Sequence, residues 1–559
     1  MINIIYKQQD KRYIFLYSED IQGNSELKKL EDYLNKIPQY MFLPSFSGIP
    51  KPEVFLNKFK SGDKTIYWCH GGLWKTIIDF LDRSKIQYNS KIDHGFTRTN
   101  FTMTLEEFTD YINSWGLYLT PRDYQIKAAW MILHYRMSLS QLATRAGKTL
   151  IAYIIFRYLL EHGHKKILMI VPSIQLVKQG VEDFKEYQEF FQTETVWAKS
   201  EYCESPNLTI GTYQSLVQRA DKRHKKYNPN WFKEYDVVCV DESHHLVCKS
   251  INTILNLDFM KNVSIRFGFT GTLPKEDTID SFCCHALMGP TIQDLSPMEL
   301  VDNGVLAKPN IEQIRIRYTL EETLSDYIKC GEYLNGNYVI KDGKKVTLNE
   351  KDFTIQHQKT LPFAIEQTKQ LLDDNEYMMY LVDLCKAKGS NLLLLEQMLV
   401  HRSKKRLDVM DKLLFGLNKN VIVFCHHTEY IRFLKKHFEE KFPDRKVLMI
   451  DGSANLKKRQ KVIDDMLVNN NCILVASYGC CSTGITFKNV DYGIFAQSFK
   501  SDIIIKQSIG RLMLKTNEKD EFYLYDLVDI FPTGKLYTQG LSKIKTYKNE
   551  GFEYSIKFV

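Results

Sequence analysis

The sequence predicts an α/β protein with two parallel-sheet domains and a small N-terminal α+β domain. Wholly apolar strand-like runs alternate with helix-like segments, and this alternation occurs in two separate series along the 559 residues. Continuous apolar strands between helices are typical of parallel sheets covered on both faces. A chain of this length is also long enough for about three domains, each with its own core.

The first series begins near Tyr118, and the second begins near residue 406. In the first series a helix is predicted over 149–161, ending before Gly163. The expected strands are 137–142, 167–171, 237–240 and 265–269 in the first series, and 421–424, 447–450, 473–476 and 522–525 in the second.

These patterns divide the chain into four predicted segments. They are an N-terminal nucleic-acid-binding domain over 1–105, a first α/β domain over 106–310, a connecting segment over 311–405 and a second α/β domain over 406–559. Within the connecting segment, an Asp-Gly turn at 342–343 predicts a hairpin, and 378–399 is predicted to be helical.

Aromatic and basic residues are interleaved in the N-terminal segment. The aromatic residues are Phe42, Phe46, Phe55, Phe59, Tyr67, Trp68 and Trp74, and the lysines are Lys51, Lys58, Lys60, Lys64 and Lys75. Lysines can contact phosphates while aromatic rings stack on bases. The alternative is that the rings form the core of a small domain. We favour core packing for most of the rings and nucleic-acid binding for the domain as a whole.

Composition indicates a soluble intracellular protein. Hydrophobic residues make up 44% and charged residues 25% of the chain, which is ordinary for a globular protein. No run approaches the roughly 20 apolar residues that cross a bilayer, and the N-terminus lacks the apolar core of a signal peptide. The 12 cysteines form no C-x-x-C pair, so reduced core thiols are expected. The net charge of +8 permits a polyanionic partner without establishing one.

A candidate phosphate-binding loop lies between the first strand and the first helix of the first series. It comprises Thr144, Arg145, Ala146, Gly147, Lys148 and Thr149. In such a loop the backbone N–H groups at the helix start hold phosphates. Lys148 would reach the terminal phosphates of ATP, and the Thr149 hydroxyl would bind Mg²⁺. Leu142 stands where the first glycine of this motif is usual, so the loop alone is a weak signal.

An acidic pair follows the third strand of the same series. Asp241 would hold Mg²⁺ through water, and Glu242 would orient or deprotonate an attacking water. His244, two residues further on, could connect this site to the rest of the cleft by hydrogen bonding. An Asp-Glu pair is often just the start of a loop, but a phosphate loop upstream makes the catalytic interpretation stronger.

The residues that precede the first strand could recognise the base of the nucleotide. Pro121 begins a predicted helix that carries Arg122, Tyr124 and Gln125. The amide of Gln125 can donate to and accept from adenine, while Arg122 and Tyr124 could pack near the base. By itself this short segment is not specific.

Taken in order, these motifs resemble those of superfamily 2 DEXH-box helicases, which have two RecA-like domains. The resembling segments are 121–125, 143–149, 171–173 with Gln179, 211–214, 241–244 and 270–272 in the first domain, and 421–425, 451–453 with Arg459, 476–478, 482–485 and 507–511 in the second. The resemblance implies an ATP- and Mg²⁺-dependent hydrolase. It implies nucleotide contacts for Gly484 and catalytic roles for Gln507 and Arg511.

Within that superfamily, the segments 475–479, 482–485 and 507–511, with the basic segment 541–544, resemble the UvsW family of bacteriophage recombination helicases. That resemblance implies remodelling of branched DNA such as forks, junctions and R-loops. DNA would lie across both domains, with its phosphates near Ser173, Gln179, Thr212, Thr272 and Ser477. Such contacts carry no sequence information, so binding would not be sequence-specific. We expect a monomer that acts in the cytoplasm, of the host cell if the protein is viral.

Two positions depart from the family pattern. Arg145 replaces a glycine of the phosphate loop, and Leu514 stands where a second arginine is usual. Without that arginine, either Arg511 acts alone or Lys515 supplies a charge with poorer geometry. We therefore expect weakened ATP hydrolysis. Three alternatives stay open: an RNA helicase, a restriction-type translocase and a nucleotide-gated clamp with little turnover.

Overall fold

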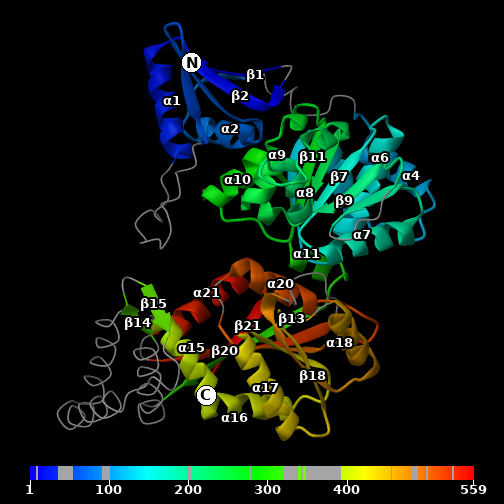
Figure 1. Ribbon diagram of the computed structural model, residues 1–559, viewed down its shortest axis with the longest axis vertical. Coiled ribbons are helices and arrows are strands. Elements are labelled where there is room, and N and C mark those ends of the chain that lie inside the picture. The colour runs from blue at the N-terminus through cyan, green and yellow to red at the C-terminus, as the bar shows by residue number, and fades with distance from the viewer. Residues whose placement is uncertain are drawn as a thin grey trace, which may run out of the picture. The chain divides into compact units, whose positions relative to one another are not determined.

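The chain forms two compact units, Met1–Ser296 and Pro297–Val559 (Figure 1). The computed structural model describes residues 1–7, 10–35, 55–90, 101–197, 203–276, 278–318, 338–341, 344–347, 392–452, 454, 456–479, 487, 489–498, 501–531 and 534–559. The predicted fold class is confirmed, because each unit contains a parallel sheet and the first also carries a small mixed sheet. The predicted boundaries at 105, 310 and 405 stay predictions.

The N-terminal sheet has five strands in the order β3-β4-β2-β1-β5. Its elements are β1 (Ile2–Lys7), β2 (Asp10–Ser18), α1 (Ile21–Leu34), β3 (Asn57–Ser61), β4 (Lys64–His70), the short 3₁₀ helix η2 (Gly71–Leu73), α2 (Trp74–Arg83) and β5 (Tyr88–Ser90). Strands β1 to β4 pair antiparallel, and β5 runs parallel to β1. Strand residues alternate between the two faces of a sheet, so each face has its own composition.

One face of this sheet is buried against α1 and α2. Its strand residues are Ile2, Ile4, Ile14, Leu16, Tyr67 and Cys69, which join leucines and isoleucines of the two helices in one core. Phe55 and Tyr67 are buried here, so core packing is correct for these two rings. Phe59 is exposed instead, and Phe42 and Phe46 lie outside the described residues. The aromatic residues of this domain therefore divide between a core and an outer face.

The N-terminal sheet domain shares its core with helix α10 (Ile279–Met288) of the neighbouring parallel-sheet domain. Phe282, Cys283 and Ala286 of α10 belong to the same buried cluster as α1 and α2. At the contact, a Cβ atom added to Gly72 would lie 2.0 Å from the carbonyl oxygen of His285. Only glycine lets the two backbones approach this closely. The two domains therefore share one core and are in close backbone contact.

Replacing Gly72 by alanine is expected to separate this contact and to lower the thermal midpoint of the first unit. A methyl group at 2.0 Å from backbone must displace one domain from the other. Overpacking of this kind typically costs about 1–3 kcal/mol. Tryptophan fluorescence can follow the change, because all six tryptophans lie between residues 68 and 231. Gly62→Ala is the matched control, since it has open space around it but carries its own left-handed strain at φ +60°. An unchanged midpoint for Gly72→Ala would contradict close packing.

The first parallel sheet has seven strands in the order β12-β6-β11-β10-β7-β9-β8. They are β6 (Met137–Leu142), β7 (Ile167–Val171), β8 (Thr193–Val196), β9 (Leu208–Thr212), β10 (Val237–Val240), β11 (Ile265–Thr270) and β12 (Thr291–Leu295). All six pairings are parallel, so the carboxyl ends of the strands meet at one edge. Four of the strands fall within the predicted runs of this series.

Helices cover both faces of that sheet. They are α4 (Leu105–Asn113), α5 (Asp123–Leu133), α6 (Lys148–Glu161), α7 (Ile174–Tyr187), α8 (Tyr213–Ala220), α9 (Lys249–Leu255) and α10, with 3₁₀ segments η3 (Pro229–Glu234), η4 (Ser243–Val247) and η5 (Asp258–Lys261). Helix α11 (Pro297–Asp302) begins the second unit. Leu168, Ile170, Val238 and Val240 pack with α8, α9 and α10 on one face. Phe156 of α6 contacts Phe267 of β11, with ring centroids 6.0 Å apart. Helices thus pack against the sheet that contains β6 and β10, and the phosphate loop and the acidic pair begin where these two strands end.

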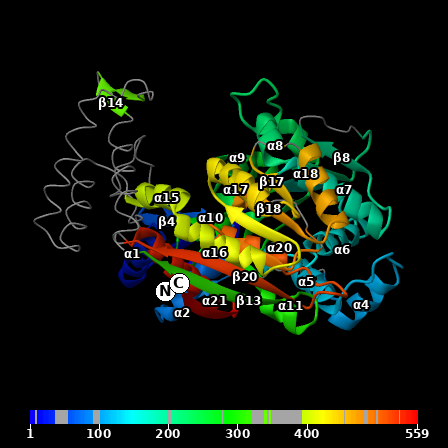
Figure 2. The same cartoon turned by 90° about the horizontal axis from the view of Figure 1, so that it is seen from below.

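The second unit contains another seven-stranded parallel sheet, in the order β17-β18-β16-β19-β20-β13-β21. Its strands are β13 (Lys308–Arg317), β16 (Val421–Cys425), β17 (Lys446–Ile450), β18 (Cys472–Ser477), β19 (Tyr492–Phe495), β20 (Glu521–Ile530) and β21 (Glu553–Phe558). Strand β13 lies beside β20 along its whole length (Figure 2). Residues 308–317, which span the predicted boundary at 310, therefore belong to this sheet.

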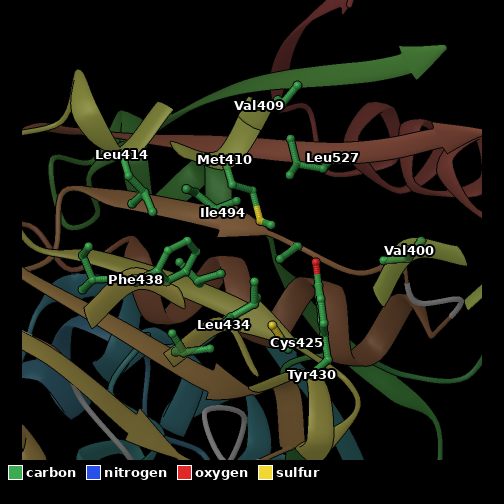
Figure 3. Packing of buried hydrophobic residues seen from close by; sticks show 14 of the residues in the cluster. Val400, Val409, Met410, Leu414, Cys425, Tyr430, Leu434, Phe438, Ile494 and Leu527 are labelled. Carbon is green, nitrogen blue, oxygen red and sulfur yellow. The ribbon is translucent and has the colours of Figure 1, made fainter. Parts of the chain in front are cut away.

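Helices α15 (Leu392–Arg402), α16 (Lys404–Phe415) and α17 (Thr428–Lys441) pack on one face of the second sheet. Their apolar side chains meet those of β16, β18 and β19 in a single cluster, where Met410, Tyr430 and Leu434 lie close to Cys425 and Ile494 (Figure 3). The remaining helices of this unit are α18 (Leu456–Val468), α20 (Asp502–Leu512) and α21 (Lys535–Asn549).

Two buried ion pairs cross the interior of this unit. The Arg406 guanidinium contacts the Asp529 carboxylate, and Lys543 of α21 contacts Asp526; all four side chains are at most 1% exposed. Tyr318 donates a second hydrogen bond to Asp529 at 2.6 Å. A buried charge without its partner is very unfavourable, so these pairs fix the positions of α16 and α21 against β20.

Several smaller predictions have an outcome here. The predicted hairpin is present as β14 (Tyr338–Lys341) and β15 (Lys344–Thr347), which pair antiparallel. The first part of the helix predicted over 378–399 lies outside the described residues, and α15 begins at Leu392. The eight cysteines that the structure describes are free thiols. Among the described helices, none is both long and apolar enough to cross a membrane.

Candidate ATP site and its helicase motifs

The predicted phosphate loop follows β6 and leads directly into α6. Gly147 has φ +80°, and a Cβ atom there would lie 2.1 Å from Nε2 of Gln125, so glycine is required. Arg145 has φ +72°, a left-handed conformation that costs most residues about 1–2 kcal/mol. Arg145 therefore keeps the left-handed backbone conformation that the glycine usual at this position would adopt easily. The N–H groups at the start of α6 are left for an anion.

Gln125 and Tyr124 support this loop from α5. Gln125 donates to the Ala146 carbonyl at 3.0 Å and accepts from the Arg122 N–H at 2.9 Å. The Tyr124 hydroxyl donates to the same Ala146 carbonyl at 3.1 Å. Both functional groups of the Gln125 amide are therefore directed at protein atoms, and adenine recognition by Gln125 stays a prediction.

The acidic pair begins at the carboxyl end of β10, on the far side of β11 from β6. Asp241 accepts from the N–H of Glu242 at 2.9 Å, and Glu242 has φ +52°. Lys148 lies 3.2 Å from Oε1 of Glu242, so the loop lysine and the acidic pair meet as predicted from their motifs. Oε2 of Glu242 is buried and lies 3.3 Å from Nδ1 of His244.

The two carboxylates have opposite electrostatic surroundings. Burial raises the pKa of Asp241 above its usual range, and the charge of Lys148 only partly opposes this. Burial acts in the same direction on Glu242, but the charge of Lys148 and the hydrogen bond and charge of His244 outweigh it and lower the pKa of Glu242. Glu242 is therefore ionised and can accept a proton from water.

His244 connects the acidic pair to the segment after β11. Its Nδ1 lies 3.1 Å from the Thr270 hydroxyl and 3.3 Å from Oε2 of Glu242. The Thr270 hydroxyl donates to the carbonyl of Thr272 at 2.8 Å, so it can only accept from His244. This arrangement places a proton on Nδ1 of His244. Thr270 was not among the residues predicted from the sequence.

The residues present fit ATP and a magnesium ion. Thr149 and Asp241 offer the oxygen ligands that Mg²⁺ prefers, and the carboxylate of Glu242 can receive a proton. The left-handed Gly147 turns the loop into α6, so that the first N–H groups of this helix face the loop. One residue beyond the predicted set adjoins Thr149. Asp183 of α7 hydrogen-bonds with it, and burial together with Glu186 raises the pKa of Asp183 to about 6.

The second unit carries the predicted arginine, Arg511, on α20, the helix between β19 and β20. Gln507 is buried and Arg511 is half-buried in the last turn of this helix. The buried Lys519 ammonium donates to the carbonyl of Leu512 and so caps the C-terminus of α20.

Leu514 forms an isolated antiparallel bridge with Leu306, and Lys515 pairs with Asp520 at 3.0 Å. Gly484 lies outside the described residues.

The predicted DNA contacts differ in exposure. Ser173 caps the N-terminus of α7 by accepting from Leu176 at 3.3 Å, and Gln179 is exposed on the same helix. Thr212 and Thr272 are each 3% exposed, and the Thr212 hydroxyl donates to Ser215 at 3.0 Å. Ser477 is half-buried at the end of β18. In this conformation Thr212 and Thr272 could contact a phosphate through their backbone rather than their hydroxyl groups.

Comparisons with known proteins agree with this site. Residues 118–275 match the family model described as "Type III restriction enzyme, res subunit", and residues 405–513 match the "Helicase conserved C-terminal domain". The solved structure of a type ISP restriction-modification enzyme, LlaBIII bound to DNA, aligns with a TM-score of 0.52 and 16% identity over 79% of this chain and 31% of that protein. That likeness concerns the fold.

Two RecA-like sheets, a phosphate loop and the ordered motifs of both units define a superfamily 2 helicase, a class of ATP hydrolases, and the chain belongs to this superfamily. It is related to the "ATP-dependent DNA helicase uvsW" of Enterobacteria phage T4. The two are 25% identical over 514 residues, which is 87% of each protein. The crystal structure of T4 UvsW aligns over 100% of this chain and 99% of its own length, with a TM-score of 0.41 and 21% identity.

Proposed function

We propose that this protein is an ATP-dependent DNA helicase that remodels branched DNA, such as forks, junctions and R-loops, in recombination, repair and replication. The observation that carries the proposal is the meeting of Lys148, Glu242 and His244 at the carboxyl ends of β6 and β10, in a relative of a DNA helicase. A bacteriophage source, a cytoplasmic location and a monomeric state are parts of the same proposal.

The side chains divide the work of hydrolysis. Lys148 and the N–H groups at the start of α6 neutralise the terminal phosphates of ATP. Magnesium held by Thr149 and Asp241 would add charge neutralisation at those phosphates. Glu242 accepts the proton of the attacking water, and His244 fixes the carboxylate while Thr270 fixes the imidazole. Arg511 of the second unit would stabilise the charge that develops in the transition state.

An ATP hydrolysis assay with different nucleic acids tests the proposal. We expect turnover to rise most with forked or junction DNA, less with single strands or blunt duplex, and least with RNA. The Lys148→Ala protein, which lacks the phosphate-binding ammonium, sets the background. Stimulation by RNA alone would refute the DNA assignment. Turnover near the Lys148→Ala background on every substrate would identify a nucleotide-gated clamp.

Replacing Arg511 by alanine is expected to lower DNA-stimulated turnover by about three orders of magnitude, since an arginine at the transferred phosphate contributes about 10³–10⁵. Lys515→Ala is the informative companion, because Lys515 is the nearest candidate for the charge that Leu514 lacks. If Arg511 acts alone, Lys515→Ala keeps turnover near the unaltered level. Full activity in Arg511→Ala would show that this arginine is not the catalytic one.

A further inference from the structure

The outer face of the N-terminal sheet, opposite α1 and α2, carries a row of aromatic rings. Trp68 of β4 lies opposite Phe15 of β2 in the register, and Phe59 of β3 lies opposite Ile66. Because paired residues and residues two apart share a face, this outer face also carries Tyr13 and Tyr17. We call it the aromatic face: Ile5, Tyr13, Phe15, Tyr17, Phe59, Ile66 and Trp68.

Two residues of the aromatic face are well exposed, Phe59 on the edge strand β3 and Ile5 on β1. Phe59 is 44% exposed and Ile5 is 36% exposed, whereas the residues on the opposite face are almost completely buried. Helices α1 and α2 account for that difference, since they belong to the core on the buried side (Figure 1). Large exposed rings gathered on one surface are a feature of binding sites rather than of an ordinary solvated sheet.

A basic side chain borders the same rings. Lys64 shares the face of Ile66 and Trp68 on β4, and its ammonium lies 5.8 Å from the centroid of the Tyr17 ring. Lys64 pairs with Glu19 at 2.7 Å at the surface. Surface pairs of this kind contribute little, so a phosphate can replace the carboxylate. Rings beside a lysine match the chemistry of bases joined by phosphates.

We propose that the aromatic face binds a single-stranded segment of nucleic acid, with bases stacked on Phe59 and Trp68 and a phosphate near Lys64. The proposal rests on the proposed function, because a helicase generates single strands that need a holding site. A duplex fits this surface less well, since the flat faces of its bases are already stacked on one another. Domain packing through α10 would hold the strand at a fixed position relative to the ATP site in the same unit.

Binding of a 20-nucleotide oligo-dT without ATP, followed by fluorescence anisotropy, tests the aromatic face. Phe59→Ala is expected to weaken binding about tenfold, because stacking on one ring contributes about 1–3 kcal/mol per base. Phe59→Tyr keeps the ring and should restore most of the affinity. Ile21→Ala removes a 91% exposed side chain from α1 of the same domain and should change nothing. ATP turnover without nucleic acid should be equal in all these proteins.

Two results would overturn the proposal. One is an unchanged affinity of Phe59→Ala and Trp68→Leu for oligo-dT. The other is an equal loss of affinity for blunt duplex, which would assign the face to double-stranded DNA. A failure of the proposed helicase function can be told apart from these results. Binding of oligo-dT by the aromatic face requires no hydrolysis and should persist in Lys148→Ala.

Discussion

Replacing Glu242 by glutamine is expected to lower ATP turnover by about two to four orders of magnitude, the usual contribution of a positioned general base. Glutamine keeps the size of the side chain but cannot take a proton from water. The surroundings favour the ionised form of this carboxylate, since Lys148 and His244 lower the pKa of Glu242. Steady-state hydrolysis with saturating DNA measures the change.

A matched control and a binding measurement complete that experiment. Glu234→Gln makes the same chemical change at a 66% exposed surface carboxylate of the same unit and should keep full turnover. ATP binding should survive in Glu242→Gln, because Lys148 and the loop backbone are intact. Turnover within a few-fold of the unaltered protein would mean that another group accepts the proton.

Replacing Arg406 by alanine is expected to destabilise the second unit by about 3–5 kcal/mol, because it leaves the buried Asp529 charge without its partner. The distribution of tryptophan allows a sharp measurement. All six tryptophans are in the first unit, so urea unfolding followed by their fluorescence should not change. Far-UV circular dichroism reports both units and should show an earlier transition for the second.

Lys436→Ala is the control for this result. Lys436 and Glu440 form an exposed pair one helical turn apart in α17, and such pairs contribute about 0.3–0.5 kcal/mol. The double variant Arg406→Met/Asp529→Leu should recover much of the lost stability, because it removes both charges together. Equal loss in the single and double variants would show that packing rather than charge holds α16 to β20.

The sequence was sufficient for the two parallel sheets because their strands are short, apolar and followed by helices. The same pattern could not identify β13 as part of the second sheet, because its pairing with β20 joins residues more than two hundred positions apart. It also could not assign Lys543. As part of a basic segment, this lysine supported a family resemblance, but in the structure it is buried against Asp526.

Motif order predicted that Lys148, Glu242 and His244 come together, and the structure brings them together. Thr270 falls in the resembling segment 270–272, but nothing in the sequence assigned it a role, because its function depends on a hydroxyl that lies between His244 and Thr272. Gln125 is a different case. Base recognition by this residue stays a prediction, and its bonds to Ala146 and Arg122 add a supporting role at the phosphate loop that its residue type did not indicate.

The shared core between the N-terminal sheet and α10 bears on how such a protein can evolve. Phe282, Cys283 and Ala286 would become exposed if the first hundred residues were lost, and Gly72 would lose the backbone against which it packs. Exchange of an N-terminal module by recombination at residue 105 would therefore need simultaneous changes in α10. The shared core thus couples substitutions in the N-terminal sheet domain to substitutions in α10.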